Sequence, residues 1–439
     1  MERIIYDDLL AWKNEEKHKP LMILGVRQCG KTYIIDEFCK KEYRYYKKIN
    51  LFENNEVVKL YKSDSSSEKK YNDLKLLIDF DFDKEGSILF IDEIQVCEEL
   101  ISELKFFNEK HSNVRIICAG SLLGVKLSRL ERPFPVGKVS RLYMYPMSFE
   151  EFLIAFEQKP LLEKIRQCFN NNESMGILHK KALEYYQKYL LSGGMPNSVL
   201  ELINCNDDYY GYDLNILNDI IEDYKNDMNS HVNNITETLK IRKIYDSLPS
   251  QLQNVSKKFQ YSGVEKNAKS RDYSQPLDWL VESNMVQICK CIKLPQKPLL
   301  GFVNNDVFKV YYSDVGIFNR IVNNDVKTII LDEMEIYKGI ITENYVANQL
   351  KASGIDLLYW QGNRDAEVDF LITTKDDGII PIEVKADVNT QSKSLGVYNN
   401  LYHPKYMIRI SAKDFGYNPD TKIKSIPLYA TYLIKDLVK

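Results

Sequence analysis

The sequence predicts a multidomain protein of the α/β class, and three observations lead to this prediction. Near the N-terminus, a short apolar run is followed by a glycine-containing loop and then by a segment with helical periodicity. Two further apolar runs end in polar residues and alternate with helical segments, which is typical of an open sheet covered by helices. The chain has 439 residues, too many for one ordinary hydrophobic core, so we expect two to four domains.

The composition is that of a soluble globular protein, with 44% hydrophobic and 28% charged residues. The 59 Lys and Arg residues are balanced by 62 Asp and Glu residues, so the overall charge does not indicate nucleic-acid binding, although a local basic surface could still provide it. No apolar run reaches membrane-spanning length, and the charged N-terminal residues are not those of a signal peptide. The eight cysteines are scattered, and the close pair Cys289 and Cys291 lacks partners for a zinc site. We therefore expect reduced thiols, no membrane partner and a cytoplasmic location.

The loop that follows the first apolar run has the pattern of a phosphate-binding loop, G-x-x-x-x-G-K-[ST]. It lies between residues 21–24, which we expect to form a buried strand, and residues 33–38, which we expect to begin a helix. In this setting the backbone N–H groups of the loop face phosphates. We expect Lys31 to reach the β- and γ-phosphates of ATP and Thr32 to hold Mg²⁺ through its hydroxyl; an ordinary glycine turn is the alternative. The predicted nucleotide-binding residues of this loop are Gly25, Val26, Arg27, Gln28, Cys29, Gly30, Lys31 and Thr32.

A second apolar run, residues 87–91, ends in Asp92 and Glu93 and predicts a buried strand with acids at its end. Phosphoryl transfer needs a carboxylate in the Mg²⁺ shell, a role we assign to Asp92. Glu93 stands where a residue that orients or deprotonates water is needed. A third predicted strand, residues 114–120, ends at Ser121. Ser121 either senses the γ-phosphate or caps the next helix, and the sequence leaves both roles open.

Helical patterning dominates from Ser148 to about residue 230. Ser148 and Glu151 have the spacing of a capping box, which predicts the start of a helix. A break between two helices is expected at residues 192–196, where two glycines and a proline occur. Earlier in the chain, the polar residues 64–70 show no periodicity and predict an exposed loop.

Residues 231–325 predict a small domain in which helices precede a two-stranded ribbon. The expected helices are 239–248 and 270–282, and the expected strands are 285–292 and 307–312. This order favours a winged-helix-like domain, whose basic helix start would contact DNA. A solvated loop rich in lysine is the alternative. The basic residues in question are Lys257, Lys258, Lys266, Lys269 and Arg271.

An acid on an apolar helix face marks the C-terminal part. Glu343 lies on the apolar stripe of the helix predicted over residues 339–353, and burying a carboxylate is costly unless it is paired or used. Two alternating strands follow, residues 366–372 and 380–386, with a turn between them. The register that keeps polar and apolar faces apart sets Asp369 opposite Glu383, and Glu367 opposite Lys385.

Two facing carboxylates repel each other unless a cation lies between them. We therefore expect Asp369, Glu383 and Glu343 to hold Mg²⁺, with Lys385 nearby to stabilise an attacked phosphate. The alternative is a half-exposed hairpin whose acids face water and whose Glu367–Lys385 pair is a weak surface salt bridge.

With these residues in place, the chain resembles a widespread prokaryotic AAA-type ATPase family with an uncharacterised C-terminal region. The resemblance extends over essentially the whole chain. It is carried by residues 25–32, 90–95, 119–122, 134–139, 145–152, 193–196, 367–370 and 382–385.

The resemblance implies an order of domains. These are an AAA-type P-loop ATPase core at 1–147, a helical lid at 148–230, a winged-helix-like domain at 231–325 and an α/β restriction-endonuclease-like domain at 326–439. The last contains what looks like a PD-(D/E)xK nuclease core, with Asp369, Glu383 and Lys385 as catalytic signature and Glu343 as helix acid.

The resemblance also implies a homo-oligomeric ring in which an arginine reaches the γ-phosphate of the neighbouring subunit. Arg129, Arg132 and Arg141 are the candidates, and the sequence does not choose among them. The expected function is Mg²⁺-dependent ATP hydrolysis coupled to DNA binding or processing, with a metal-dependent, nuclease-like C-terminal domain that grips or nicks DNA. The alternative is a nucleotide-gated regulatory switch or scaffold whose C-terminal domain is catalytically inactive.

Overall fold

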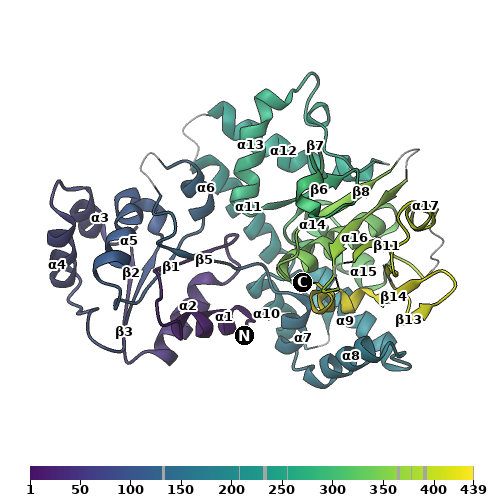
Figure 1. Ribbon diagram of the computed structural model, residues 1–439, viewed down its shortest axis with the longest axis horizontal. Helices are drawn as coiled ribbons and strands as arrows, with labels where there is room; N and C mark the ends of the chain where they lie inside the picture. Colours follow the sequence, from purple (N-terminus) through teal and green to yellow (C-terminus); the bar gives the residue numbers. More distant parts are fainter. Residues whose placement is uncertain are drawn as a thin grey trace. The chain divides into compact units, whose positions relative to one another are not determined.

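The computed structural model describes residues 1–130, 134–206, 208–230, 235–254, 256–362, 366–376, 378–388 and 393–438 (Figure 1). The chain divides into two compact units. The first contains residues 1–145 together with 282–284, and the second contains 146–281 together with 285–439. The finer division into four domains stays a prediction.

The first unit is built on a parallel sheet with the strand order β2-β3-β4-β1-β5. Every residue of β1, β3 and β4 is buried, as expected where helices cover both faces of a parallel sheet. The predicted α/β core with a parallel sheet is thereby confirmed. The strands are β1 Leu21–Leu24, β2 Tyr45–Asn50, β3 Ser87–Asp92, β4 Ile116–Ala119 and β5 Ser140–Tyr143.

Alternate residues of these strands face two helical layers. On one face, Met22, Leu89 and Ile116 belong to a single buried cluster that also contains side chains of α3, α4 and α5. On the other face, α2 packs against β2, β3 and β4. The helices of this unit are α1 Ile5–Lys13, α2 Lys31–Glu42, α3 Asn55–Lys62, α4 Ser67–Leu77, α5 Glu98–Lys110 and α6 Leu123–Ser128.

One prediction for this unit is wrong. Residues 64–70 do not form an exposed loop, because α4 begins at Ser67. Ser66 is its N-cap, and its side chain accepts a hydrogen bond from the Lys69 N–H. Lys70 is buried, although the polar sequence suggested that it faces water. Its ammonium group donates a hydrogen bond to the Tyr61 carbonyl at 2.9 Å, which offsets the cost of burying the charge.

The second unit begins with helices and continues as a mixture of helices and strands (Figure 1). The predicted capping box is confirmed: the Ser148 side chain accepts from the Glu151 N–H at 3.2 Å, and the Glu151 carboxylate accepts from the Ser148 N–H at 2.8 Å. The helices are α7 Phe149–Ala155, α8 Lys159–Asn171, α9 Leu178–Ser192, α10 Pro196–Asn204, α11 Asn215–Ser230, α12 Ile235–Gln253, α13 Ser270–Glu282, α14 Val315–Ile321, α15 Val326–Ile330, α16 Glu335–Ala352 and α17 Lys393–Tyr402.

The expected break between α9 and α10 is present, and its cause lies far along the chain. Gly193 has a φ of +64°, and a Cβ there would stand 2.1 Å from a carboxylate oxygen of Asp314. Asp314 accepts from the Gly194 N–H at 2.7 Å and caps α14 through the Ile317 N–H at 3.0 Å. The glycine pair therefore lets one carboxylate hold two segments.

The described residues of the second unit form two sheets, with the strand orders β7-β6-β8-β9 and β10-β11-β12-β14-β13. The predicted antiparallel ribbon is formed by β6 and β7, but it is not a free wing, since β6 also pairs in parallel with β8. The strands are β6 Val286–Ile292, β7 Val303–Tyr312, β8 Leu358–Gln361, β9 Glu367–Val368, β10 Phe370–Thr373, β11 Ile379–Val384, β12 Met407–Ser411, β13 Gly416–Asn418 and β14 Ile423–Pro427. A 3₁₀ segment, Leu428–Asp436, follows β14 and packs against α16.

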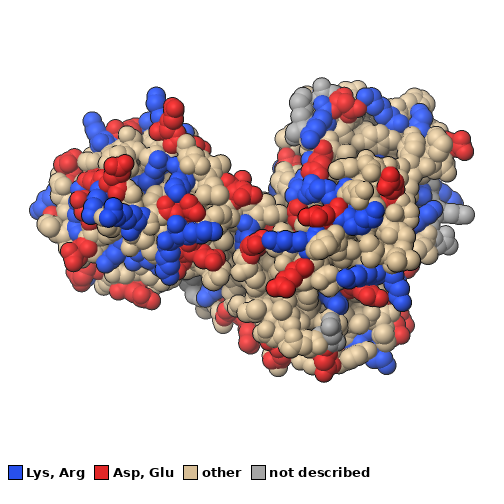
Figure 2. Space-filling view, turned by 90° about the horizontal axis from the view of Figure 1, so that it is seen from below, with Lys and Arg blue, Asp and Glu red and all other residues tan. Residues whose placement is uncertain are grey.

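In the parts of the chain that the structure describes, no helix is both long and apolar enough to cross a membrane. On the face drawn in Figure 2, lysine and arginine side chains are interspersed with acidic ones.

Candidate functional site

The candidate site of the first unit lies where its parallel strands end. The carboxyl ends of parallel strands meet at one edge of a sheet, and this edge is the usual ligand site of open α/β sheets. The phosphate-loop pattern follows β1, Asp92 ends β3, and Gly120 and Ser121 follow β4. Because β3, β4 and β1 are neighbours in the sheet, segments far apart in the sequence meet here.

The loop after β1 has the backbone of a phosphate cradle. Gln28 and Gly30 adopt left-handed conformations, with φ of 63° and 96°. Gly25 has a φ of 151°, and a Cβ there would lie 2.1 Å from the Met144 carbonyl oxygen, so only glycine fits. Arg3 adds a support that the sequence did not indicate, since its guanidinium donates to the Cys29 carbonyl at 2.7 Å.

Lys31 is buried and its ammonium group lies inside the loop. It donates to the carbonyl oxygens of Gly25 at 2.7 Å and Val26 at 2.8 Å. These bonds keep the charge paired and the side chain curled over the loop. A phosphate entering the cradle offers the same ammonium group a charged acceptor in place of two neutral ones.

Thr32 and Asp92 lie together as the Mg²⁺ prediction requires. The Thr32 hydroxyl is 3.3 Å and 3.4 Å from the two carboxylate oxygens of Asp92. One hydroxyl and one carboxylate beside a phosphate cradle are ligands that Mg²⁺ accepts, with water and phosphate oxygens completing its shell. Lys48 was missed from the sequence: its ammonium group lies 3.1 Å from Asp92 Oδ2 and compensates the buried carboxylate.

Glu93 is held by a neighbour that sequence reasoning also missed. It adopts a left-handed conformation, with a φ of 57°, and its carboxylate accepts from the Gln95 side-chain amide at 2.5 Å. Gln95 is buried, and within the described residues its Oε1 has no hydrogen-bond partner. A Cβ on Gly120 would lie 1.7 Å from that oxygen. Gly120 therefore makes room for the residue that positions Glu93.

Ser121 does not cap the next helix. The N-cap of α6 is Leu122, and no side chain of the described residues makes a capping hydrogen bond there, so the capping alternative is wrong and the phosphate-sensing role stays a prediction. Of the three candidate arginines, Arg132 lies outside the described residues. Arg141 is on β5 with its guanidinium over the Phe134 ring, and Arg129 follows α6. None of these contacts selects one of them.

The second cluster surrounds Glu343 on α16. This carboxylate is buried and accepts from Tyr311 at 2.5 Å, while the fully buried ammonium group of Lys309 lies 3.1 Å away. Lys257 forms a further ion pair with it. Burial alone would raise the pKa of Glu343, but Lys257 and Lys309 more than offset this and hold the pKa well below its usual range. The expected acid on the apolar stripe is therefore paired with lysines.

Asp369 marks the position where one strand changes partners. Residues 366–372 are not one strand: β9 pairs with β8, and β10 pairs with β11. At the junction, the Asp369 carboxylate accepts from the Val384 N–H at 2.8 Å. Burial and the nearby charge of Glu343 raise the pKa of Asp369 to about 7.

The register of β10 and β11 pairs Phe370 with Ile382, and continuing it sets Asp369 opposite Glu383, as expected. The predicted Glu367–Lys385 pair is wrong. Glu367 belongs to β9 and binds Lys309 at 2.6 Å, whereas Lys385 lies 2.9 Å from Glu383. The sequence pattern could not show that the strand divides at Asp369.

The predicted three-acid metal centre is not formed. Glu343 lies near Asp369, whose pKa its charge raises, but it is paired with Lys309 and Lys257, whereas Glu383 is paired with Lys385. Over the described ranges, no three His, Cys, Asp or Glu side chains are grouped so that they could hold a metal ion. The ammonium groups of Lys257 and Lys309 compensate the charge of Glu343.

Comparison with protein families divides the chain into three matched parts. Residues 17–153 match a family described as an AAA domain. Residues 183–328 and 338–430 match two families, each described as a domain of unknown function (DUF8612 and DUF4143). No curated protein matches the chain.

Similar solved structures include the Walker-type ATPase PABY2304 of Pyrococcus abyssi, at 15% identity and a TM-score of 0.41, covering 72% of this chain and 94% of that chain. Another is the ORC2 protein of Aeropyrum pernix with ADPNP and ADP, at 14% identity and a TM-score of 0.34, covering 76% of this chain and 95% of that chain. A third is the ORC1 protein of the same organism in complex with DNA, at 10% identity and a TM-score of 0.29, covering 73% of this chain and 90% of that chain.

The parallel sheet, the cradle after β1 and the carboxylate at the end of β3 define the first unit as a P-loop nucleotide-binding domain. With the family match over residues 17–153, this unit contains a nucleotide-binding domain of the AAA type.

Proposed function

We propose that the protein is a Mg²⁺-dependent ATPase that couples nucleotide binding and hydrolysis to contact with DNA. The observation that carries the proposal is the meeting of Thr32 with Asp92 beside the buried Lys31, with Glu93 next in the chain. In this mechanism Lys31 and the loop N–H groups hold the triphosphate. Thr32 and Asp92 hold Mg²⁺, which would neutralise charge on the phosphates.

Glu93 has the role of general base in this proposal. Its carboxylate is tied to Gln95. To act as a base, the Glu93 carboxylate must release the side-chain amide of Gln95 and accept a hydrogen bond from a water molecule in line with the γ-phosphate. Gln95 Oε1, which has no hydrogen-bond partner among the described residues, offers a second acceptor for the same water.

The test compares Glu93→Gln with Glu109→Gln, a substitution on the exposed end of α5. Glu93→Gln should bind ATP as the wild type does but hydrolyse it about 10²- to 10⁴-fold more slowly, the range expected for losing a general base. Glu109→Gln should keep the wild-type rate. Steady-state phosphate release measures the hydrolysis rate of each variant, and adding EDTA shows whether that rate requires Mg²⁺. A Glu93→Gln protein that turns over normally would remove Glu93 from the mechanism.

The DNA part of the proposal is supported by the basic start of α13. Lys266, Lys269 and Arg271 are exposed there, whereas Lys257 is withdrawn into the pair with Glu343. Removing one lysine that binds a phosphate should reduce the salt dependence of duplex affinity by about one ion. Lys269→Gln should lower that slope, and Lys69→Gln, on α4, should not. An unchanged slope would place the DNA-binding surface elsewhere.

For the C-terminal residues, the contacts favour the second candidate, a switch or scaffold without metal-dependent cleavage. Glu343 is paired with Lys309 and Lys257, and Glu383 is paired with Lys385. We infer that this nuclease-like region holds its partners without cutting them. Incubating plasmid DNA with the protein in Mg²⁺ or Mn²⁺ tests this: no nicking is expected, and nicking that is lost in Asp369→Ala would restore the metal-dependent nuclease. A ring assembly stays a prediction.

A further inference from the structure

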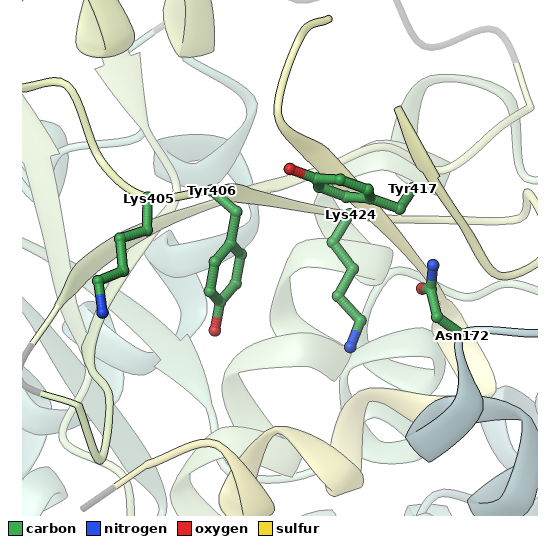
Figure 3. Close-up of a pocket in the computed structure, with 5 residues that line it drawn as sticks. All are labelled: Asn172, Lys405, Tyr406, Tyr417 and Lys424. Atoms are coloured by element: carbon green, nitrogen blue, oxygen red, sulfur yellow. The ribbon is translucent and has the colours of Figure 1, made fainter. Parts of the chain in front are cut away.

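An open pocket of the second unit lies where β12 and β14 begin (Figure 3). Its volume is about 320 Å³, and it is lined by Asn172, Lys405, Tyr406, Tyr417 and Lys424. Figure 3 shows the polar ends of Lys405, Tyr406 and Lys424 pointing the same way, away from the Tyr417 ring, which is drawn near the backbone end of Lys424. None of these residues takes part in the nucleotide site or in the Glu343 cluster.

Lys424 supplies the charge of this pocket. It is half-buried, with its ammonium group over the Phe169 ring at 4.8 Å, and burial lowers its pKa. Across the described stretches of the chain it forms no ion pair with a carboxylate. Lys405 differs, because its ammonium group lies 2.5 Å from Asp376. The net positive charge that faces the pocket is therefore that of Lys424.

The lining selects an anion. Among the described residues, no carboxylate lines the pocket, so the lining does not favour a metal ion, and the lysines would repel a cationic ligand. Tyr406 offers a phenol O–H, which stays protonated because burial and the charge of Asp376 raise its pKa. Asn172 adds an amide that can donate. A phosphate oxygen is the acceptor that such donors bind best.

The size of the pocket and its aromatic rim indicate more than a bare phosphate. A volume of about 320 Å³ lies at the lower end of small-molecule sites, at roughly ten times the space of one water. Tyr417 is 47% exposed and presents a ring at the rim. Exposed aromatic rings beside lysines are the elements on which bases of single-stranded nucleic acids stack.

We propose that this pocket binds one nucleotide of a single-stranded nucleic acid, with its phosphate at Lys424 and Tyr406 and its base on the Tyr417 ring. The inference rests on the proposed role in nucleic-acid binding, and it assigns a contact separate from the basic start of α13. The pocket lies at the β-strands of the C-terminal sheet. The single-stranded nucleic acid would therefore bind to the same region that we infer does not cleave it.

The experiment measures binding of a fluorescent oligothymidylate to the full chain by anisotropy over a range of salt concentrations. Tyr417→Ala should weaken binding by about 5- to 150-fold, which is the value of one stacked base. Lys424→Met keeps an aliphatic chain near Phe169 and should reduce the salt slope by about 0.7, the value of one single-strand phosphate contact. Lys413→Met is the matched control, an exposed lysine beyond the other end of β12, and should bind as the wild type does.

If the wild type binds the oligonucleotide and both pocket variants bind equally well with the same salt slope, the pocket assignment is overturned while the proposed function stands. If the wild type binds duplex DNA but no single strand, the pocket assignment is also overturned. If neither duplex nor single strand binds, the proposed function itself fails. Thermal unfolding of each variant shows whether a lower affinity reflects a smaller amount of folded protein.

Discussion

At the residue scale, Gly120 is the position on which the geometry around Glu93 depends most sharply. A methyl group there would stand 1.7 Å from Gln95 Oε1, so Gln95 must leave its place beside Glu93. Gly120→Ala should therefore destabilise the protein by about 1–3 kcal/mol, the usual cost of overpacking. It should also slow ATP hydrolysis. Chemical denaturation and phosphate release measure the two effects.

A control and a rescue separate this contact from general effects of alanine. A Cβ at Gly396, on α17, would have no atom of the described residues within 4 Å, so Gly396→Ala should be neutral or slightly stabilising. Adding Gln95→Ala to Gly120→Ala removes the clash and should restore most of the stability but not the rate. A Gly120→Ala protein with wild-type stability and rate would mean that Gln95 does not hold Glu93.

Which site residues the sequence predicts depends on how far apart the partners lie. Lys31, Thr32 and Asp92 follow from local spacing, because the chemistry of a phosphate cradle fixes neighbours along the chain. The roles of Arg3 and Lys48 cannot be predicted in this way. Each contacts a group at least 26 residues away, and such a contact can be inferred only once the fold is known. Long-range ion pairs leave no periodic trace in a sequence.

At the scale of elements, the Lys309 ion pairs join β7 to α16 and β9. Its ammonium group lies 3.1 Å from Glu343 and 2.6 Å from Glu367, and the side chain is fully buried. Lys309→Met should cost about 3–5 kcal/mol, because removing one partner leaves buried charge without compensation. Urea unfolding measures it. Lys385→Met, at a pair whose lysine is 37% exposed, should cost about 1 kcal/mol or less, and equal costs would contradict the assignment.

Asp369 should make stability depend on pH. Its folded pKa of about 7 exceeds the ordinary value of about 3.9, so the folded state holds a proton that the unfolded state releases. Stability from this group is therefore complete below about pH 4 and is lost as the pH rises to about 7. Asp369→Asn should match the wild type near about pH 4 and exceed it by about 1–4 kcal/mol near about pH 8. A constant difference at both pH values would show that Asp369 keeps an ordinary pKa.

Element boundaries follow from the sequence where a local signal sets them. Helix α13 spans the predicted residues, and the capping box starts α7, because both depend on side chains within one helical turn. The start of α4 was missed because its periodicity is weak and a buried lysine stands on its inner face. The division of one predicted strand at Asp369 depends on two different partner strands, which alternation of side chains alone does not reveal.

At the scale of the whole molecule, the α/β class and the class of the first unit follow from the chain itself. Buried apolar runs alternating with helices dictate a parallel sheet, and the cradle must then stand at its carboxyl edge. The nuclease-like residues are different. Asp369, Glu383 and Lys385 have the expected spacing in the sequence, but in the folded chain Glu343 forms ion pairs with lysines. Spacing predicts which residues are available and does not predict which of them meet.

The central claim is that the first unit captures ATP–Mg²⁺ through the loop of residues 25–32, and calorimetry on the intact chain tests it most directly. The wild type should release or absorb measurable heat at one site per chain, and so should Lys40→Ala, an exposed lysine of the adjoining helix. Lys31→Ala should show no binding, because the ammonium group that now lies on the Gly25 and Val26 carbonyls is the one that must turn to the phosphates. ATP binding by Lys31→Ala with wild-type affinity would contradict this claim.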